Sequence, residues 1–272
     1  MREEPVYPAT LLIHLGGLGD VSVSESSLLS LRHHYGKTIK AVGARRVLDQ
    51  FIDYFAGTDS IDSRAWAYLF SDSLEEPHWP RIVFFGKDRQ GLLRDGLSRL
   101  CEELLFIDMY PDERSLPVEE YQLEQLKVLG IAPVKAEFLR RPGDRIILYP
   151  ETGHEKIKWP VERFLEVFAK LRERRMNVVM MRPPGLSLPV PDSVSHEDLG
   201  DVAAFLSSQG GAFFSNDSGM AHFAARHGLR ALTLFREADP AIWAPKGSRV
   251  LACRENPPTV DQVIAFIMSE MV

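Results

Sequence analysis

The stretch LLIHLGGLGD at residues 11–20 decides the fold class. Residues 11–15 are a short apolar run, glycines follow at positions 16, 17 and 19, and leucines recur with helical spacing over residues 24–35. The order strand, glycine turn, helix begins an α/β unit. A nicotinamide cofactor is disfavoured, because the glycines do not have the GxGxxG spacing of dinucleotide sites.

Strands and helices alternate on both sides of a turn-rich stretch. The pattern predicts strands over residues 39–42, 66–70, 82–85 and 104–109, with helices over 45–55 and 119–129. It restarts with strands over 145–149, 177–181, 211–215 and 231–235, and helices over 161–174, 199–209, 219–227 and 260–271. Alternation of this kind predicts a mainly parallel sheet in each half.

The length of 272 residues suits two modest domains. Residues 130–144 include the charged turn Arg140-Arg141-Pro142-Gly143, which suits a connector. We therefore expect domains at residues 1–141 and 142–272.

Bulk composition excludes several classes of protein. A formal net charge of -6 argues against a dedicated nucleic-acid binder. Cys101 and Cys253 are far apart and lack ligand spacing, so neither a disulfide framework nor a metal site is indicated. The charged N-terminus lacks a signal-peptide core and no apolar run is long enough to span a membrane, which predicts a cytoplasmic protein.

The first candidate site is the turn of Gly16, Gly17 and Gly19, which ends in Asp20. Glycines allow close approach to the backbone, and a carboxylate after the first strand would reach the crevice where doubly wound sheets bind ligands. The alternative is that Asp20 caps the following helix. Taken alone, the residue type favours the cap.

Two further polar turns predict anion binding. The loop after residue 149 contains Thr152, Gly153, Lys156 and Lys158, which suit a diphosphate, although single loop lysines are usually solvated. The strand over 211–215 runs into Asn216-Asp217-Ser218-Gly219 and an alanine-rich helix, whose first N–H groups suit an anion. The alternatives are a capping role for Asp217 and a packed His222.

Together the three segments resemble glycosyltransferase family 9, the bacterial lipopolysaccharide heptosyltransferases. The resemblance rests on LGGLGD, the block KWPVERF and the segment NDSGMAHFAA followed by LTLF and DP. It implies a GT-B fold, in which two Rossmann-like domains face each other across a cleft, with the terminal helix packing back toward the first domain. The first domain would hold the acceptor and the second the nucleotide sugar.

The resemblance also implies roles for individual residues. Asp20 matches the family's general base for the acceptor hydroxyl, which suits an inverting transfer. Thr152, Gly153 and either Lys156 or Lys158 match its phosphate loop. The second donor-binding turn is matched by Asp217, Ser218, Gly219, Met220, Ala221 and His222.

This chain departs from the family at three places. His14 replaces a basic residue before the first motif, and Ile157 stands where a phosphate lysine is usual. Arg236-Glu237 replace a Gly-Pro pair before Asp239.

The expected function is metal-independent transfer of a heptose or related sugar from a nucleoside diphosphate, ADP by analogy, to a lipid-linked saccharide at the cytoplasmic membrane face. No cofactor is expected. Two alternatives stay open: a non-catalytic family member that binds a nucleotide sugar or a partner, and a sugar-nucleotide epimerase of the same fold.

Overall fold

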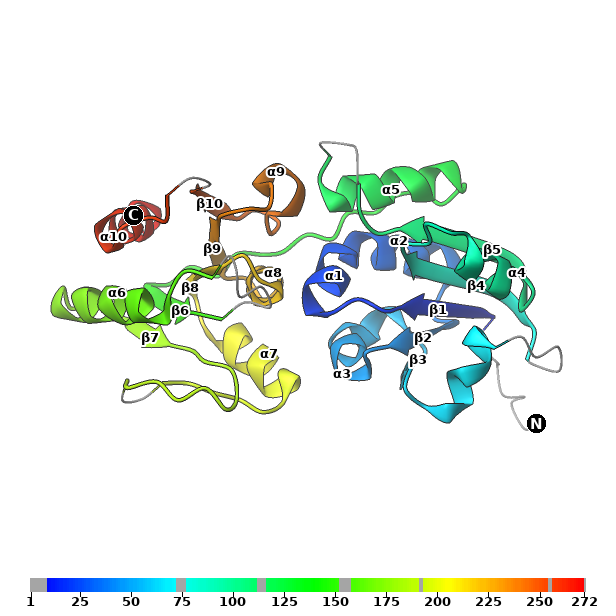
Figure 1. The fold of residues 1–272 in the computed structure, drawn as a ribbon, viewed down its shortest axis with the longest axis horizontal. Helices are drawn as coiled ribbons and strands as arrows, with labels where there is room; N and C mark the ends of the chain where they lie inside the picture. The colour runs from blue at the N-terminus through cyan, green and yellow to red at the C-terminus, as the bar shows by residue number, and fades with distance from the viewer. Residues whose placement is uncertain are drawn as a thin grey trace. The chain divides into compact units, whose positions relative to one another are not determined.

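The computed structural model divides the chain into two compact units, Met1–Ala136 and Glu137–Val272. The division falls five residues before the boundary that the sequence predicts at 141. The structure describes residues 9–71, 77–111, 116–151, 158–190, 193–253 and 256–271. Each unit is an α/β domain in its own right (Figure 1).

The first unit contains a five-stranded parallel sheet with the order β3-β2-β1-β4-β5. Its strands are β1 (Thr10–His14), β2 (Ile39–Gly43), β3 (Gly57–Ser60), β4 (Trp79–Gly86) and β5 (Cys101–Asp108). The chain winds from β1 to one edge and then returns to continue on the other side of β1. The order therefore reverses between β1 and β4, which makes that position the switch point of the sheet.

Helices cover both faces of this sheet. They are α1 (Leu18–Val23), α2 (Glu25–Tyr35), α3 (Arg45–Leu48), η1 (Asp49–Tyr54), η2 (Arg64–Phe70), α4 (Leu92–Ser98) and α5 (Val118–Val128). One core joins strand residues such as Leu12 to Leu31 of α2 and Leu126 of α5. A second core, on the opposite face, joins Ile13 to Trp66 of η2.

The second unit contains another five-stranded parallel sheet, ordered β10-β9-β8-β6-β7. Its strands are β6 (Arg145–Tyr149), β7 (Val178–Met180), β8 (Gly211–Asn216), β9 (Arg230–Phe235) and β10 (Arg249–Ala252). Here the strand order reverses between β6 and β8, so the switch point of this sheet lies between those two strands.

The helices that accompany the second sheet in the described part of this unit are α6 (Val161–Glu173), α7 (Leu199–Ser208), α8 (Gly219–Arg226), α9 (Pro240–Trp243) and α10 (Val260–Glu270). α6 is strongly amphipathic, and it buries Phe164, Val167 and Leu171 against the sheet. The terminal helix α10 joins the same core through Val263 and Ile267. It packs against α6 within the second unit, and a contact with the first unit stays a prediction.

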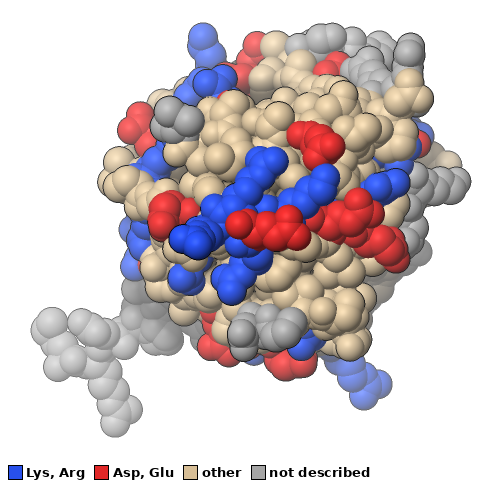
Figure 2. All heavy atoms as spheres, turned by 90° about the vertical axis from the view of Figure 1, so that its left-hand side faces the viewer, with Lys and Arg blue, Asp and Glu red and all other residues tan. Residues whose placement is uncertain are grey.

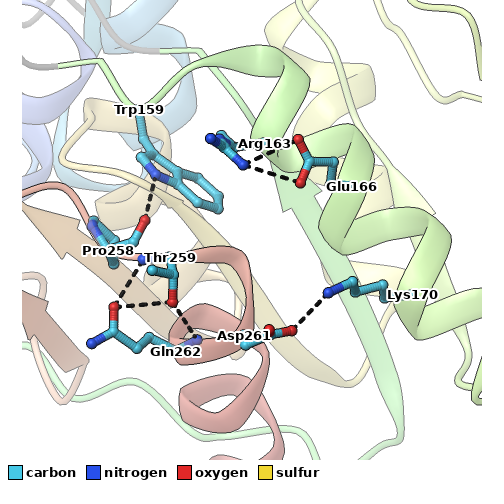
Figure 3. A network of polar contacts seen from close by, with 8 residues as sticks. All are labelled: Trp159, Arg163, Glu166, Lys170, Pro258, Thr259, Asp261 and Gln262. Carbon is cyan, nitrogen blue, oxygen red and sulfur yellow. Dashed lines mark hydrogen bonds and ion pairs between the residues drawn. The ribbon is translucent and has the colours of Figure 1, made fainter.

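Polar contacts reinforce the pair α6 and α10 (Figure 3). Lys170 on α6 pairs with Asp261 on α10 at 2.7 Å. Thr259 caps α10 in a capping box with Gln262. On this side of the molecule, basic and acidic side chains interleave (Figure 2), which is typical of a solvated, ion-paired surface.

The structure corrects two predicted elements and adds others. The helix predicted over 45–55 is a short α3 followed by the 3₁₀ helix η1, which is interrupted at Phe51. Residues 66–70 are not a strand but part of the 3₁₀ helix η2, capped by Ser63. The aromatic run is typical of a buried strand. Trp66 and Tyr68 are indeed buried, but they lie on a helix. The sequence pattern missed the edge strands β3 and β10 and the helix α4. No helix among the described residues is long and apolar enough to cross a membrane.

Candidate functional site

The glycine turn that carries Asp20 lies at the switch point of the first sheet. β1 ends at His14, which pairs in register with Phe85 of β4. The two rings stack with their centroids 5.1 Å apart. Parallel sheets of this topology bind ligands outside the carboxyl ends of the strands at the switch point.

Asp20 is held by donors from two elements. Its Oδ2 accepts the backbone N–H of Gly17 at 2.9 Å, so the carboxylate, at position N3 of α1, makes the capping-box contact with the N-cap residue. Its Oδ1 accepts the Tyr110 hydroxyl at 2.7 Å. Gly16 is required beside it, because a Cβ on Gly16 would lie 2.4 Å from the Cβ of Asp20. The half-buried carboxylate is thus fixed in one orientation at the edge of the sheet.

Sequence reasoning missed Tyr110, which follows β5. The Tyr110 backbone N–H donates to Asp108 Oδ1 at 3.3 Å. The Gln125 side chain of α5 in turn accepts the Asp108 backbone N–H and donates to the Asp108 carbonyl. The pKa of Tyr110 is raised well above its usual range, first by burial and then by the bond to Asp20. The hydroxyl therefore stays a proton donor at neutral pH.

His14 is fully buried next to the glycine turn that carries Asp20. Its Nδ1 accepts the Gly16 N–H at 3.2 Å, and its Nε2 lies 3.2 Å from the Ser24 hydroxyl. The neutral ring therefore carries its proton on Nε2. Burial lowers the pKa of His14 to about 4, although the charge of Asp20 acts in the opposite direction. His14 thus supports the turn as an uncharged side chain and does not supply the positive charge that the resembled family has there.

Acid should destabilise the protein through His14. Its pKa is about 4 when folded and 6.5 in the reference state, so the unfolded chain takes up the proton first. The free energy of unfolding should then fall as pH drops from about 6.5 to about 4. We expect His14→Gln, which keeps an acceptor and a donor, to reduce the loss between pH 7 and pH 5 by about 2 kcal/mol in denaturant titrations. Parallel losses in both proteins would contradict this assignment.

Asn216 joins two segments across the switch point of the second sheet. It is the last residue of β8 and is almost fully buried. Its Oδ1 accepts the Trp159 backbone N–H at 2.9 Å, and its Nδ2 donates to the Pro150 carbonyl at 2.9 Å. One amide therefore joins the two described segments that flank residues 152–157. The sequence contained Asn216 in its NDSG motif but did not indicate this role.

The NDSG turn leads directly into α8. Ser218 is the N-cap, and its Oγ accepts the Ala221 N–H at 3.3 Å. The N–H groups of Gly219 and Met220 have no acceptor within the helix, which suits an anion there. Asp217 is tied to β9 through its N–H, which donates to Leu234 at 3.0 Å.

His222 and Ala221 are buried in α8. The structure therefore places both among the packed residues of the helix, as the alternative interpretation of His222 expected. Direct contact of either side chain with a ligand stays a prediction.

The predicted phosphate loop is only partly within the described residues. Thr152, Gly153, Lys156 and Ile157 lie outside them. Lys158 is described, and its ammonium pairs with Glu151 at 2.6 Å, with both side chains about four-fifths buried. A phosphate contact by Lys158 stays a prediction, and it would have to be shared with that carboxylate.

Trp159 is a packing residue. It is 1% exposed and lies in the core with Phe164 and Phe214. Its indole N–H donates to the Pro258 carbonyl at 3.1 Å, just before α10 (Figure 3). Trp159 therefore anchors the end of the predicted phosphate loop to the second core.

The turn after β9 carries the third departure from the resembled family. Arg236 is half-buried and Glu237 is exposed. Asp239 caps the short helix α9 by accepting the Ala241 N–H at 3.0 Å. Among the described residues, no group of three or more His, Cys, Asp or Glu side chains could hold a metal ion.

Comparison with known proteins identifies the fold. No family model and no curated protein matches this chain. A glycosyltransferase family 9 structure from Veillonella parvula matches with a TM-score of 0.70 and 14% identity, over 96% of each chain. The E. coli heptosyltransferase WaaC with ADP matches with a TM-score of 0.67 and 17% identity, over 96% of this chain and 99% of that one. The predicted α/β fold of two Rossmann-like domains is confirmed, and its likeness is to family 9.

The fold alone does not separate transferases from other users of nucleotide sugars. A putative UDP-N-acetylglucosamine 2-epimerase from Listeria monocytogenes matches with a TM-score of 0.55 and 14% identity, over 97% of this chain and 88% of that one. Function has to be argued from the two polar turns and their chemistry.

Proposed function

We propose that this protein is an inverting glycosyltransferase of family 9 that uses a nucleoside-diphosphate sugar. The observation that carries the proposal is the position of the two polar turns. Asp20 and Asn216-Asp217-Ser218 each lie at the switch point of their own sheet, where such folds bind ligands. One turn offers a fixed carboxylate, and the other offers helix N–H groups.

The chemistry assigns a role to each turn. Asp20 removes the proton of an acceptor hydroxyl as the oxygen attacks the anomeric carbon from the face opposite the diphosphate. The bond from that carbon to the phosphate oxygen breaks, and the nucleoside diphosphate leaves with the electron pair. The N–H groups at the start of α8 and the lysines of the 151–158 loop stabilise the charge that develops on the leaving group.

The ligands of the fold relatives suggest the substrates. WaaC was solved with ADP, so ADP-heptose is the proposed donor. The proposed acceptor is a lipopolysaccharide-core or other lipid-linked saccharide, met at the cytoplasmic face of a membrane. Transfer is proposed to need no metal ion, with Gly16, Gly17 and Gly19 shaping the acceptor side.

A ligand screen followed by a turnover assay tests the proposal. A nucleotide present at a hundred times its dissociation constant should stabilise the protein by about 2.7 kcal/mol. We expect ADP and ADP-heptose to raise the melting temperature, and ADP to be released from ADP-heptose only when an acceptor is present. Turnover should survive EDTA. Stabilisation by no nucleotide and turnover with no acceptor would refute the proposal.

A second candidate function is nucleotide-sugar binding without catalysis. The pair Lys158–Glu151 favours it, because the only described lysine of the predicted phosphate loop already has a carboxylate partner. Both oxygens of Asp20 also accept hydrogen bonds. Binding of ADP without release of ADP from any donor and acceptor would favour this function over transfer.

Tyr110 should matter if Asp20 is the base. Tyr110→Phe removes the donor to Oδ1 and leaves the ring in place, so the carboxylate loses one of its two fixed contacts. We expect turnover to fall by about tenfold at an unchanged donor KM, since a charge-assisted hydrogen bond contributes about 1.5–3 kcal/mol.

Tyr54→Phe is the matched control, because Tyr54 donates to the carboxylate of Glu25 at 2.6 Å in the same unit. It should cost stability but leave turnover close to wild type. Equal turnover losses in the two variants would show that Tyr110 acts on stability alone.

A further inference from the structure

A small pocket lies at the amino-terminal ends of β8 and β9, whereas the NDSG turn follows the carboxyl end of β8. Its volume is about 220 Å³. We call it the arginine pocket, after the residues that define it: Arg140, Arg141, Arg230 and Glu270, with the backbone of Gly143 and Gly211. This volume is below the 300–1,000 Å³ typical of sites for drug-sized ligands, so a compact ligand fits it best.

The arginine pocket is separate from the proposed donor site. Gly211 and Arg230 are the first residues of β8 and β9, whereas Asn216 is the last residue of β8. At about 3.3 Å per residue, the length of β8 places its two ends roughly 17 Å apart. A diphosphate held at the NDSG turn therefore does not reach the arginines.

Among the described residues that line the pocket, three arginines accompany one carboxylate, that of Glu270. Glu270 is shared between Arg230 at 3.8 Å and Arg249 at 3.3 Å, so one carboxylate faces two guanidinium groups. Arg140 donates to the carbonyl of Gly247, which carries no charge. Within the described part of the chain, no carboxylate pairs with Arg140 or Arg141. This excess stands out in a chain of net charge -6.

The field of these arginines also reaches a neighbouring side chain. The pKa of His227 is lowered to about 4 by burial and then by the charges of Arg226 and Arg141. The Nδ1 atom of the neutral His227 ring lies 2.7 Å from the Ser207 hydroxyl oxygen. Arg141 therefore adds, after burial and Arg226, to the effects that keep His227 uncharged.

The backbone beneath the arginines is held firmly. The Arg141 N–H donates to Gly228 at 2.7 Å, and the Arg141 carbonyl accepts from Gly211 at 3.2 Å. Gly143 crosses Gly210 so closely that a Cβ on Gly143 would lie 2.4 Å from the Gly210 carbonyl carbon. The backbone that carries Arg141 is thus fixed before a ligand binds, which lowers the cost of ordering it.

We propose that the arginine pocket binds a phosphate group, carried either by a free phosphate or phosphomonoester or by a lipid headgroup. A planar guanidinium donates two parallel hydrogen bonds to phosphate oxygens, and three guanidinium groups neutralise a dianion beside Glu270. The site is distinct from the donor site, and the proposal does not depend on the transferase assignment.

Thermal unfolding in inorganic phosphate tests the proposal, with sodium chloride at matched ionic strength as the reference. Phosphate should raise the melting temperature saturably, beyond the effect of chloride. Arg141 has no ion-pair partner among the described residues, so Arg141→Ala should fold normally. We expect this variant to raise the half-saturating phosphate concentration about threefold to fivefold, and Arg140→Ala with Arg141→Ala about tenfold.

The matched control is Arg172→Ala, which removes an exposed arginine from α6 in the same unit. It should leave the phosphate response unchanged. Equal responses of the Arg141 and Arg172 variants, or a phosphate effect no larger than that of chloride, would overturn the proposal. The first result would place any bound phosphate elsewhere, including at the NDSG turn.

Vesicles distinguish the two sources of phosphate. Cosedimentation with phosphatidylglycerol vesicles, but not with phosphatidylcholine vesicles, that is weakened by Arg141→Ala and competed by inorganic phosphate assigns the site to a lipid headgroup. A phosphate response that depends on Arg141 without vesicle binding assigns it to a free phosphate compound. Absence of both overturns the proposal.

Discussion

Asp20→Asn should lower turnover by about a hundredfold to ten-thousandfold with saturating donor and acceptor. The substitution removes the basicity of the side chain but keeps its size. The amide oxygen can still accept the Gly17 N–H, which caps α1, and the amide nitrogen can donate to the Tyr110 oxygen. Stability should therefore change by less than about 1 kcal/mol.

Three measurements on one preparation separate the roles of Asp20. Steady-state turnover with the donor and acceptor found by the ligand screen gives the catalytic effect, calorimetric titration with ADP gives donor binding, and thermal unfolding gives the cap. Asp20→Ala is the comparison variant, since it loses both the base and the capping-box hydrogen bond and should cost about 0.5–1.5 kcal/mol more in stability. Near-wild-type turnover of Asp20→Asn would leave Asp20 with a capping role alone.

The sequence predicted the interior strands of both described sheets and the edge strands β5 and β7, and it missed the edge strands β3 and β10. β1, β4, β6, β8 and β9 are apolar runs in the interior of a parallel sheet, and runs of that kind are visible without a structure. β3 and β10 are short edge strands with the sequences GTDS and RVLA. Both are four residues long and mostly not buried, so they carry little of the apolar signal of a buried strand.

The strand prediction over residues 66–70 was wrong, because an aromatic run is not specific to strands. Trp66, Tyr68 and Leu69 are buried and apolar, as in a strand. Ser63 instead caps the 3₁₀ helix η2. Its side chains pack against one face of the first sheet and are not part of a strand. Local pattern does not distinguish these two ways of burying an aromatic side chain.

The candidate site residues differ in whether a local sequence pattern indicates them. Asp20 and the NDSG turn are local signals, each a polar group between a strand and a helix. Tyr110 is 90 residues from Asp20 in the sequence. A tyrosine directly after a predicted strand was the only available signal, since the carboxyl ends of parallel strands share one edge of a sheet. Which residue meets Asp20 depends on the strand order, and the sequence alone did not provide it.

Asn216→Ala should have the largest effect on the second unit. It leaves the Trp159 N–H and the Pro150 carbonyl without their partner in a buried environment, and each unpaired group costs about 1–3 kcal/mol. We expect a loss of roughly 3 kcal/mol, which lowers the melting temperature by about 6–12 °C. Affinity for ADP should fall at least about tenfold, because the segments that flank the predicted phosphate loop are no longer joined.

Two variants separate the bridge from the helix cap. Asn216→Asp keeps an acceptor for the Trp159 N–H but places an oxygen against the Pro150 carbonyl, so it should lose ADP affinity as Asn216→Ala does. Ser218→Ala removes only the N-cap of α8 and should cost about 1 kcal/mol. If Asn216→Ala bound ADP with wild-type affinity in calorimetric titrations, the loop would not depend on the bridge, and the donor diphosphate would have to be held by α8 alone.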